Sequence, residues 1–164
     1  MSKTVLKVQD CPLEHLQALL DNYQLNIILV APYKAIPGSY WGDTEAGIIN
    51  NSLYDSPETP IHSLLHESCH YICMDKHRRE ILDTNAEGDY DEENGVCYLQ
   101  ILLADKIPNM GKNRMMLDMD SWGYTFRLGS AENWFNEDAE DALAWLQNYK
   151  IVDQERTVTF NLRQ

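Results

Sequence analysis

The residues best suited to chemistry lie in one short stretch, HSLLHESCHYICM, which covers positions 62–74. It places His66 and His70 four residues apart, with Glu67 directly after the first histidine. Residues at i and i+4 share a face of a helix, so two imidazoles at this spacing can bind one zinc ion. A carboxylate beside the first ligand can take a proton from a zinc-bound water. The stretch therefore predicts a hydrolytic zinc site.

A zinc site of this kind needs a third protein ligand. The pattern that continues with a glycine and a third histidine is absent, because Cys73 and Lys76 occupy those positions. The alternative is a glutamate from a later helix. The segment DYDEENGVCYLQILLAD offers two adjacent candidates, Glu92 and Glu93.

Packing favours Glu92 over Glu93. The ligand helix must lie close to the histidine helix, and Gly95, three residues after Glu92, permits a close approach. Glu92 also heads an apolar stripe that would point inward, formed by Val96, Leu99 and Leu103. We therefore expect Glu92 to bind the metal, with Glu93 as a supporting neighbour or an alternative ligand.

The segments GIINNSLYDSPETPIHSLLHESCHYI and EENGVCYLQILLA resemble the ImmA/IrrE-like gluzincin metallopeptidases. In that family a strand and a turn lead into an HExxH helix. The next helix carries a glutamate, a small residue, an aromatic residue and a Leu-Leu pair, which are matched here by Glu92, Gly95, Tyr98 and Leu102–Leu103. The resemblance covers residues 47–104. It departs from the family at Val96, where asparagine is usual, and at Gly95, where alanine is common.

The resemblance implies a zinc-dependent peptidase that acts on a peptide or protein substrate. Carried over to this chain, it implies His66, His70 and Glu92 as zinc ligands and Glu67 as the general base. Peptide hydrolysis also needs a donor to the oxyanion. Tyr124 is a candidate because it follows the ligand helix among aromatic residues, although an ordinary core tyrosine fits equally.

Two further side chains are candidates for the site. Arg127 is the alternative oxyanion donor, since it lies close to Tyr124 in the sequence. His62 lies one helical turn before His66, so we expect it near the metal ligands or on the surface.

Other interpretations of the same residues stay open. The segment Asp83–Asn94 resembles a calcium loop, but Asn94 stands where a bidentate glutamate is needed, which favours a solvated acidic turn. A non-catalytic zinc-binding or protein-interaction module is the alternative function. Cys69 and Cys73 could contribute to a structural zinc site, although such a site gains nothing from Glu67. A third possible function, that of an inhibitor or immunity-type protein, is supported only by the acidic net charge.

The net charge of −13 limits the classes of partner. Such a chain repels phosphate backbones and anionic membrane surfaces, so we expect neither a nucleic-acid nor a membrane partner. A basic protein or peptide is compatible with this charge. The sequence contains no run that could span a membrane and no signal-peptide core, which predicts a cytoplasmic protein. We expect the four cysteines to be reduced and mostly buried: Cys11, Cys69, Cys73 and Cys97.

The elements that must position the site form one α+β domain over residues 1–164, with enough apolar residues, 44%, for a single core. We expect a small zincin-like fold in which a short mixed β-sheet packs on the histidine helix and the glutamate helix. The expected helices cover 10–23, a segment from Ser56 or Thr59 to about Asp75, Asp91–Lys106 and part of 130–150. The expected strands are 25–31, Gly47–Asn50 and an edge strand at 156–162, while 115–128 fits either helix or strand.

Two segments could contact a substrate directly. Gly47–Asn50 could pair with an extended peptide by strand addition. The loop Pro32–Ala46, rich in turn residues, could line the cleft or cover it.

Overall fold

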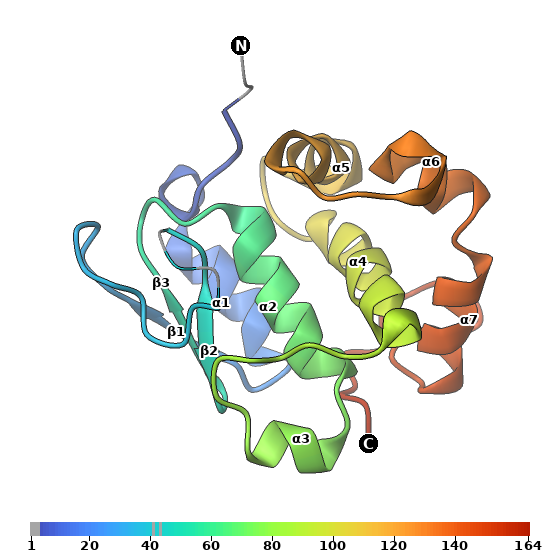
Figure 1. The fold of residues 1–164 in the computed structure, drawn as a ribbon, viewed down its shortest axis with the longest axis horizontal. Coiled ribbons are helices and arrows are strands. Elements are labelled where there is room, and N and C mark those ends of the chain that lie inside the picture. The colour runs from blue at the N-terminus through green and yellow to red at the C-terminus, as the bar shows by residue number, and fades with distance from the viewer. Residues whose placement is uncertain (1–3, 41, 43) are drawn as a thin grey trace.

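The computed structural model describes residues 4–40, 42 and 44–164. Over these residues the chain forms a mixed α/β fold with a three-stranded sheet and seven α-helices (Figure 1). The strands are β1 (Asn26–Leu29), β2 (Gly47–Ile49) and β3 (Ser52–Asp55). The helices are α1 (Leu13–Asp21), α2 (Ile61–Cys73), α3 (Lys76–Glu80), α4 (Tyr90–Ala104), α5 (Gly111–Trp122), α6 (Ala131–Glu137) and α7 (Glu140–Asn148).

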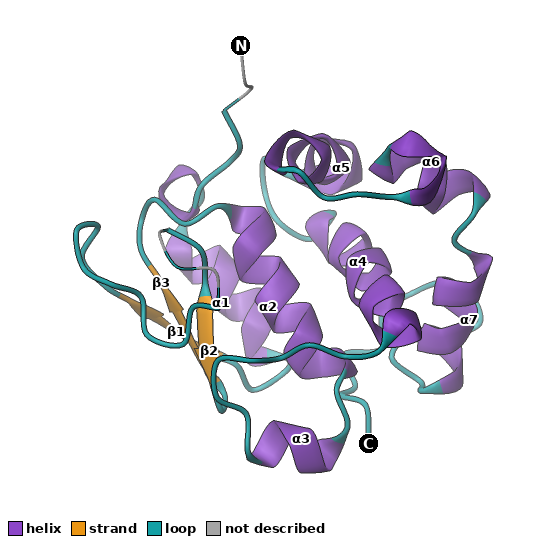
Figure 2. Ribbon diagram, in the orientation of Figure 1, coloured by secondary structure: helices purple, strands orange, loops and turns teal. Residues whose placement is uncertain are grey.

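The layers are arranged around α2. The sheet covers one side of this helix and α4 packs on the other, while α7 lies on the far side of α4 (Figure 2). Most of α2 is buried, including apolar residues on every face, such as Ile61, Leu65 and Ile72. A helix buried on all sides is held by its neighbours, so its position in the fold is well determined.

The sheet has the order β1-β3-β2, with β1 parallel and β2 antiparallel to β3. A two-residue turn joins β2 to β3, and Asn50 adopts a left-handed conformation there with φ of 52°. Asparagine tolerates this conformation, which suits a tight hairpin. Ile48 and Leu53 pair across the hairpin and are fully buried. The hairpin thus holds the sheet against the helices.

Strand addition at β2 is contradicted by the structure, because other parts of the chain already cover its outer edge. The Ile48 N–H donates to the Gly38 carbonyl (3.1 Å), and the Ile48 carbonyl accepts from the Thr84 N–H (2.8 Å). The Asn50 N–H donates to the Leu82 carbonyl (2.8 Å). These bonds use the main-chain groups that an incoming peptide would need.

The expected elements nearest the candidate site are confirmed, and each is somewhat shorter than predicted: α1, β1, β2, α2 and α4, of which α4 begins one residue early, at Tyr90. Neither expected cap of α2 forms. The helix begins after Pro60, and the Thr59 hydroxyl instead accepts a hydrogen bond from the Ser56 N–H (2.9 Å). Two short elements, α3 and β3, were not predicted from the sequence.

The second half of the chain differs more from expectation. The ambiguous segment 115–128 is helical as far as Trp122, where α5 ends. Residues 130–150 form two helices, α6 and α7, rather than one. The expected strand at 156–162 is wrong: within the described chain this tail forms only an isolated bridge, Val152 to Val158. It packs against the helices instead, and the Arg163 N–H donates to the Ile72 carbonyl (2.9 Å).

The four cysteines are free, and three of them are buried, as expected. Across the described residues, no helix is both long and apolar enough to cross a membrane.

Candidate metal centre

His66 and His70 lie on successive turns of α2, and their side chains converge. The two Nε2 atoms are 3.1 Å apart, and the rings are nearly perpendicular, at 89°. The spacing of four residues produces this geometry directly, because α2 is a regular helix there. The prediction that these two histidines share a face is confirmed.

Glu93 on α4 completes the cluster. Its Oε2 lies 3.5 Å from Nε2 of His70, and one ligand atom from each of His66, His70 and Glu93 lies within 4.8 Å of the others. The Gly88 N–H donates to the other carboxylate oxygen (3.0 Å), which restrains the side chain. Two imidazoles and one carboxylate form a donor set that binds zinc and other divalent transition metals.

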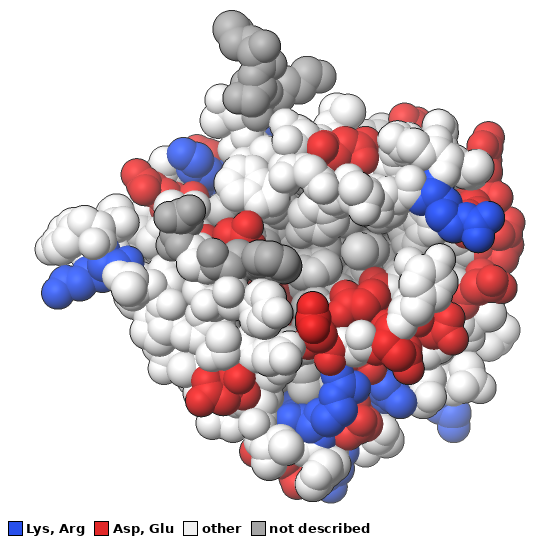
Figure 3. Space-filling view, viewed as in Figure 1, with Lys and Arg blue, Asp and Glu red and all other residues white. Residues whose placement is uncertain are grey.

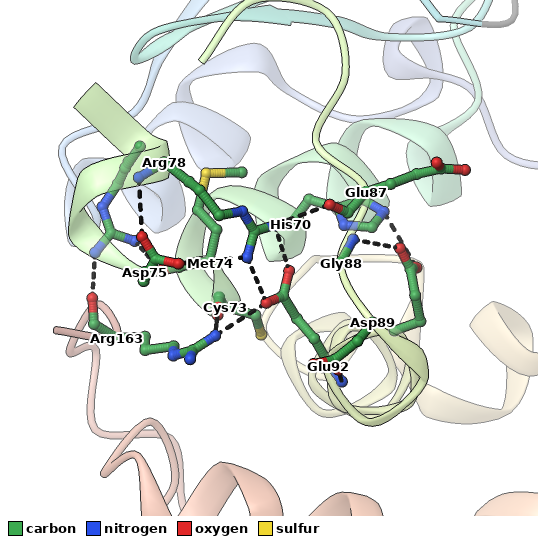
Figure 4. Close-up of polar contacts among 12 residues, drawn as sticks. His70, Cys73, Met74, Asp75, Arg78, Glu87, Gly88, Asp89, Glu92 and Arg163 are labelled. Carbon is green, nitrogen blue, oxygen red and sulfur yellow. Dashed lines mark hydrogen bonds and ion pairs between the residues drawn. The ribbon is translucent and has the colours of Figure 1, made fainter. Parts of the chain in front are cut away.

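Glu92 does not face the histidines, contrary to the prediction. Its carboxylate is buried and lies between two guanidinium groups, as Figure 4 shows. Arg78 donates to both carboxylate oxygens at 2.8 Å, and Arg163 donates to Oε1 at 2.9 Å. Glu92 therefore joins α3 and the C-terminal segment to α4.

Gly95 packs against α7, and not against α2 as predicted. A Cβ at Gly95 would lie 2.7 Å from the Trp145 ring of α7, so the close approach that Gly95 permits is with α7. Adjacent helical residues differ by about 100° around the axis, since a turn holds 3.6 residues. Once Gly95 faces α7, the residue that faces α2 is Glu93.

Gln100 orients the first histidine. Its Oε1 lies 2.9 Å from Nδ1 of His66, and its Nε2 donates to the His62 carbonyl (3.0 Å). This amide orientation assigns the ring proton of His66 to Nδ1, which leaves Nε2 free to bind a metal. The contact between Gln100 and His66 was not predicted from the sequence. Its signal was a polar residue in an apolar run, seven residues after Glu93 and so on the same helical face.

The two histidines are in the protonation state that binding a cation requires. Burial lowers the pKa of His66, and it lowers the pKa of His70 well below the ordinary value, with neighbouring His66 and Arg78 acting in the same direction. Both imidazoles are therefore neutral near pH 7, as metal binding requires. Burial also raises the pKa of Glu93. The donors present fit a divalent metal ion.

Glu67 lies where two pockets meet. One, of about 300 Å³, is lined by His66, Glu67, His70, Glu93 and the segment 84–88. The other, of about 440 Å³, is lined by Glu45, Ser63, His66, Glu67 and residues 122–124. Burial, with smaller contributions from Glu45, Glu93 and Asp55, raises the pKa of Glu67 to about 8. The predicted base thus shares a pocket with all three members of the cluster.

Tyr124 also reaches this site. Gly123, with φ of 110°, ends α5, and the Tyr124 N–H donates back to Met119 (3.1 Å). The Tyr124 ring packs edge-on against His66, with centroids 5.4 Å apart. Burial raises the pKa of Tyr124 well above its ordinary value, so its hydroxyl remains protonated and able to donate.

His62 is buried rather than on the surface. Its Nδ1 lies 3.2 Å from the Tyr124 hydroxyl, and its ring packs on Trp122. Burial and neighbouring His66 lower the pKa of His62 to about 3, so this ring is neutral. His62 therefore contacts Tyr124 rather than joining the cluster. Arg127, the alternative oxyanion donor, pairs with Asp138 instead (2.8 Å).

The calcium-loop interpretation does not fit the structure. Asp89 caps α4 by accepting from the Glu92 N–H (2.9 Å), so Asn94 lies inside a helix and not at the end of a loop. Asp83 and Asn85 accept local hydrogen bonds, from Thr84 and from the Glu87 N–H. Cys69 and Cys73 are buried in the core. In the described part of the chain, the only group placed to hold a metal is His66, His70 and Glu93.

Comparisons with protein-family models, with curated proteins and with solved structures found no match to this chain. The resemblance to the ImmA/IrrE-like peptidases therefore rests on residues 47–104 alone.

Proposed function

We propose that this protein is a zinc-dependent peptidase of the zincin type. The observation that carries the proposal is the convergence of His66, His70 and Glu93, with ligand atoms within 4.8 Å, in a pocket that Glu67 also lines. Two neutral imidazoles and a carboxylate would hold a zinc ion through three protein ligands, and catalytic zinc sites with three protein ligands also bind a water. A carboxylate beside that position is the arrangement that metal-assisted hydrolysis requires.

Each residue of the site has a distinct role in the proposed hydrolysis. When bound, zinc supplies a Lewis acid that polarises the peptide carbonyl and acidifies the attacking water. Glu67 accepts the proton of that water and delivers it to the leaving nitrogen. Tyr124 donates a hydrogen bond to the oxyanion. Gln100 keeps His66 in the tautomer that binds a metal, and Gly88 restrains Glu93.

Two measurements test the proposal. Purified protein loaded with zinc and passed through a desalting column should retain about one ion per chain, and His66→Ala should retain none. Glu67→Gln should keep the ion and lose cleavage of a peptide library followed by mass spectrometry. A wild-type protein that retains no zinc would exclude the metal site. Zinc retention without any cleavage would favour the non-catalytic binding module, and cleavage by Glu67→Gln would remove Glu67 from the mechanism.

A further inference from the structure

The two pockets that meet at Glu67 are both lined by carboxylates. The pocket beside the segment 84–88 contains Glu87 and Glu93, and the pocket beside α5 contains Glu45. Glu67 lines both. Among the described residues, no lysine or arginine lines either pocket. The groups that a ligand meets here are therefore acidic or neutral.

A divalent metal would not balance this charge. A metal ion held by His66, His70 and Glu93 would bring two positive charges next to Glu67 and Glu93, whereas four carboxylates line the two pockets. Glu45 and Glu87 remain, one in each pocket, and no ion pair among the described residues includes either carboxylate. Charge left uncompensated in a cleft favours a cationic ligand.

Arg78 contacts the main chain of Glu87 and forms its ion pairs with other carboxylates. It donates to the Glu87 carbonyl (2.9 Å), and its other contacts are with Glu92 and Asp75. The Glu87 side chain extends away from this guanidinium group in Figure 4. Acidic groups also gather around the start of α4 in Figure 3, where Asp89 and Asp91 are exposed. The side chains that line this end of the cleft therefore include carboxylates and no basic group among the described residues.

The second pocket combines a carboxylate with aromatic rings. Trp122 is 43% exposed, and its Nε1–H donates to Glu45 (3.0 Å) across the pocket. The Tyr124 ring lines the same space. Ammonium and guanidinium groups bind to aromatic faces, and a nearby carboxylate strengthens the attraction. This pocket can therefore accept a lysine or arginine side chain.

We propose that the cleft binds a cationic polypeptide segment, with one basic side chain against Glu87 and another against Glu45 and Trp122. The scissile bond then lies between them, over Glu67. This order along the segment rests on the proposed peptidase function, whereas the preference for basic residues rests on the two pockets. The net charge of −13 acts in the same direction, because it attracts cations over a distance.

The test measures binding, so it does not depend on cleavage. Zinc-loaded Glu67→Gln protein is titrated with three fluorescent decapeptides of equal length: lysine- and arginine-rich, neutral, and glutamate-rich. The basic peptide should bind at least about tenfold more tightly than the neutral one at low salt, with the difference shrinking as salt rises. Adding Glu45→Gln or Glu87→Gln should weaken binding of the basic peptide about fivefold each, the upper range for an exposed ion pair.

Glu155→Gln is the matched control, because it removes the same charge from an exposed turn that lines neither pocket. Each variant is first shown to retain zinc. Equal affinity for the basic and neutral peptides would overturn the inference. So would a loss from Glu155→Gln as large as that from Glu45→Gln or Glu87→Gln. Displacement by spermine at equal concentration would contradict a polypeptide ligand.

Cleavage by the wild-type protein separates the two proposals. Pocket-dependent binding of the basic peptide without cleavage would leave the cationic ligand in place and contradict the peptidase. Cleavage with no preference for basic residues would support the peptidase and contradict the cationic ligand.

Discussion

Two adjacent glutamates on α4 have different surroundings, although nothing in their own chemistry distinguishes them. Glu92 is enclosed by Arg78 and Arg163, so its charge is matched within the protein. Glu93 has a main-chain donor, Gly88, and otherwise faces His70. A carboxylate that is paired with two guanidinium groups stabilises the fold and has no charge left for a metal ion. A carboxylate that faces neutral imidazoles can still bind a cation.

Neutralising each glutamate in turn should separate these roles. Glu93→Gln should weaken zinc binding by at least about 100-fold, since even partners outside the coordination sphere contribute 10- to 100-fold. Glu92→Gln should leave zinc affinity within about threefold of wild type, because its side chain contacts the arginines and not the histidines. Competition with a chromogenic chelator measures both. The reverse pattern would restore Glu92 as the ligand.

The same Glu92→Gln variant should be less stable. We expect a loss of about 1–3 kcal/mol in the free energy of unfolding, because the hydrogen bonds from Arg78 and Arg163 to the charged carboxylate weaken. The loss is limited because Arg78 is partly exposed to solvent. Urea denaturation of the metal-free proteins measures this, with Glu93→Gln as the neighbouring control. Equal stability of both variants would contradict the structural role of Glu92.

Removing the Tyr124 hydroxyl tests the proposed role of Tyr124 as an oxyanion donor. Tyr124→Phe should lower kcat by about 100-fold, the effect of losing one oxyanion donor, with KM and zinc content unchanged. The ring remains, so its packing on His66 is kept. Steady-state kinetics on a cleaved peptide is the measurement. An unchanged kcat would make Tyr124 an ordinary packing residue.

At the scale of elements, α4 forms an interface on each of two faces. One face carries Glu93 and Gln100 toward α2, and the other packs Gly95 against Trp145 of α7. The rotation of α4 about its axis is therefore determined by α2 and α7 together. That rotation decides which glutamate reaches the histidines.

Gly95→Ala tests the contact with α7. Alanine would favour the helix by about 1 kcal/mol, but a Cβ at 2.7 Å from Trp145 overpacks the interface at a cost of about 1–3 kcal/mol. We expect a net loss of stability by urea denaturation. In a Trp145→Leu background the same change should become neutral or stabilising, because the clash is gone. A loss of equal size in both backgrounds would place the cause elsewhere.

At the scale of the whole molecule, buried ionisable groups couple stability to pH. Asp55, the last residue of β3, is fully buried, and neither carboxylate oxygen has a hydrogen-bond partner among the described residues. Burial raises the pKa of Asp55 to about 8. The same carboxyl titrates near 3.9 in an unfolded chain. The folded protein therefore binds a proton that the unfolded chain releases.

The sign of the pH dependence follows from this difference. Stability from Asp55 is complete below about pH 4 and is lost as pH rises through about 8. The lowered pKa values of His62, His66 and His70 act oppositely, but only as pH falls below about 6.5. Between pH 6.5 and 8 the acids dominate, with Glu67 adding to Asp55.

We therefore expect metal-free wild-type protein to lose stability from pH 6.5 to pH 8, and Asp55→Asn to show a shallower decline. Urea unfolding at intervals of half a pH unit measures both slopes. The decline of stability with pH that remains in Asp55→Asn reflects the titration of Glu67. It should therefore become smaller still when Glu67→Gln is added to Asp55→Asn. Identical slopes in wild type and Asp55→Asn would show that Asp55 is not protonated in the folded state.

Local sequence was sufficient for part of the site and of the fold. The positions of His66, Glu67 and His70 on one helix follow from a spacing of four residues, and α1, α2 and α4 follow from apolar periodicity and turn residues. These features depend on interactions within a few residues, which a sequence displays directly. Short elements such as β3 and α3 carry too few residues for a periodic signal.

Tertiary contacts decided the rest. The third member of the cluster is Glu93 because α7 receives Gly95 and thereby rotates α4, and α7 lies about 50 residues further along the chain. The edge of β2 is closed because residues 82–84 return to it, and Gln100 orients His66 because α4 packs on α2. Helical periodicity relates residues to one another on a helix, but only the packed neighbours determine which face points where. The sequence thus determined that His66, Glu67 and His70 lie together on one helix, and the tertiary structure determined which residues lie opposite them.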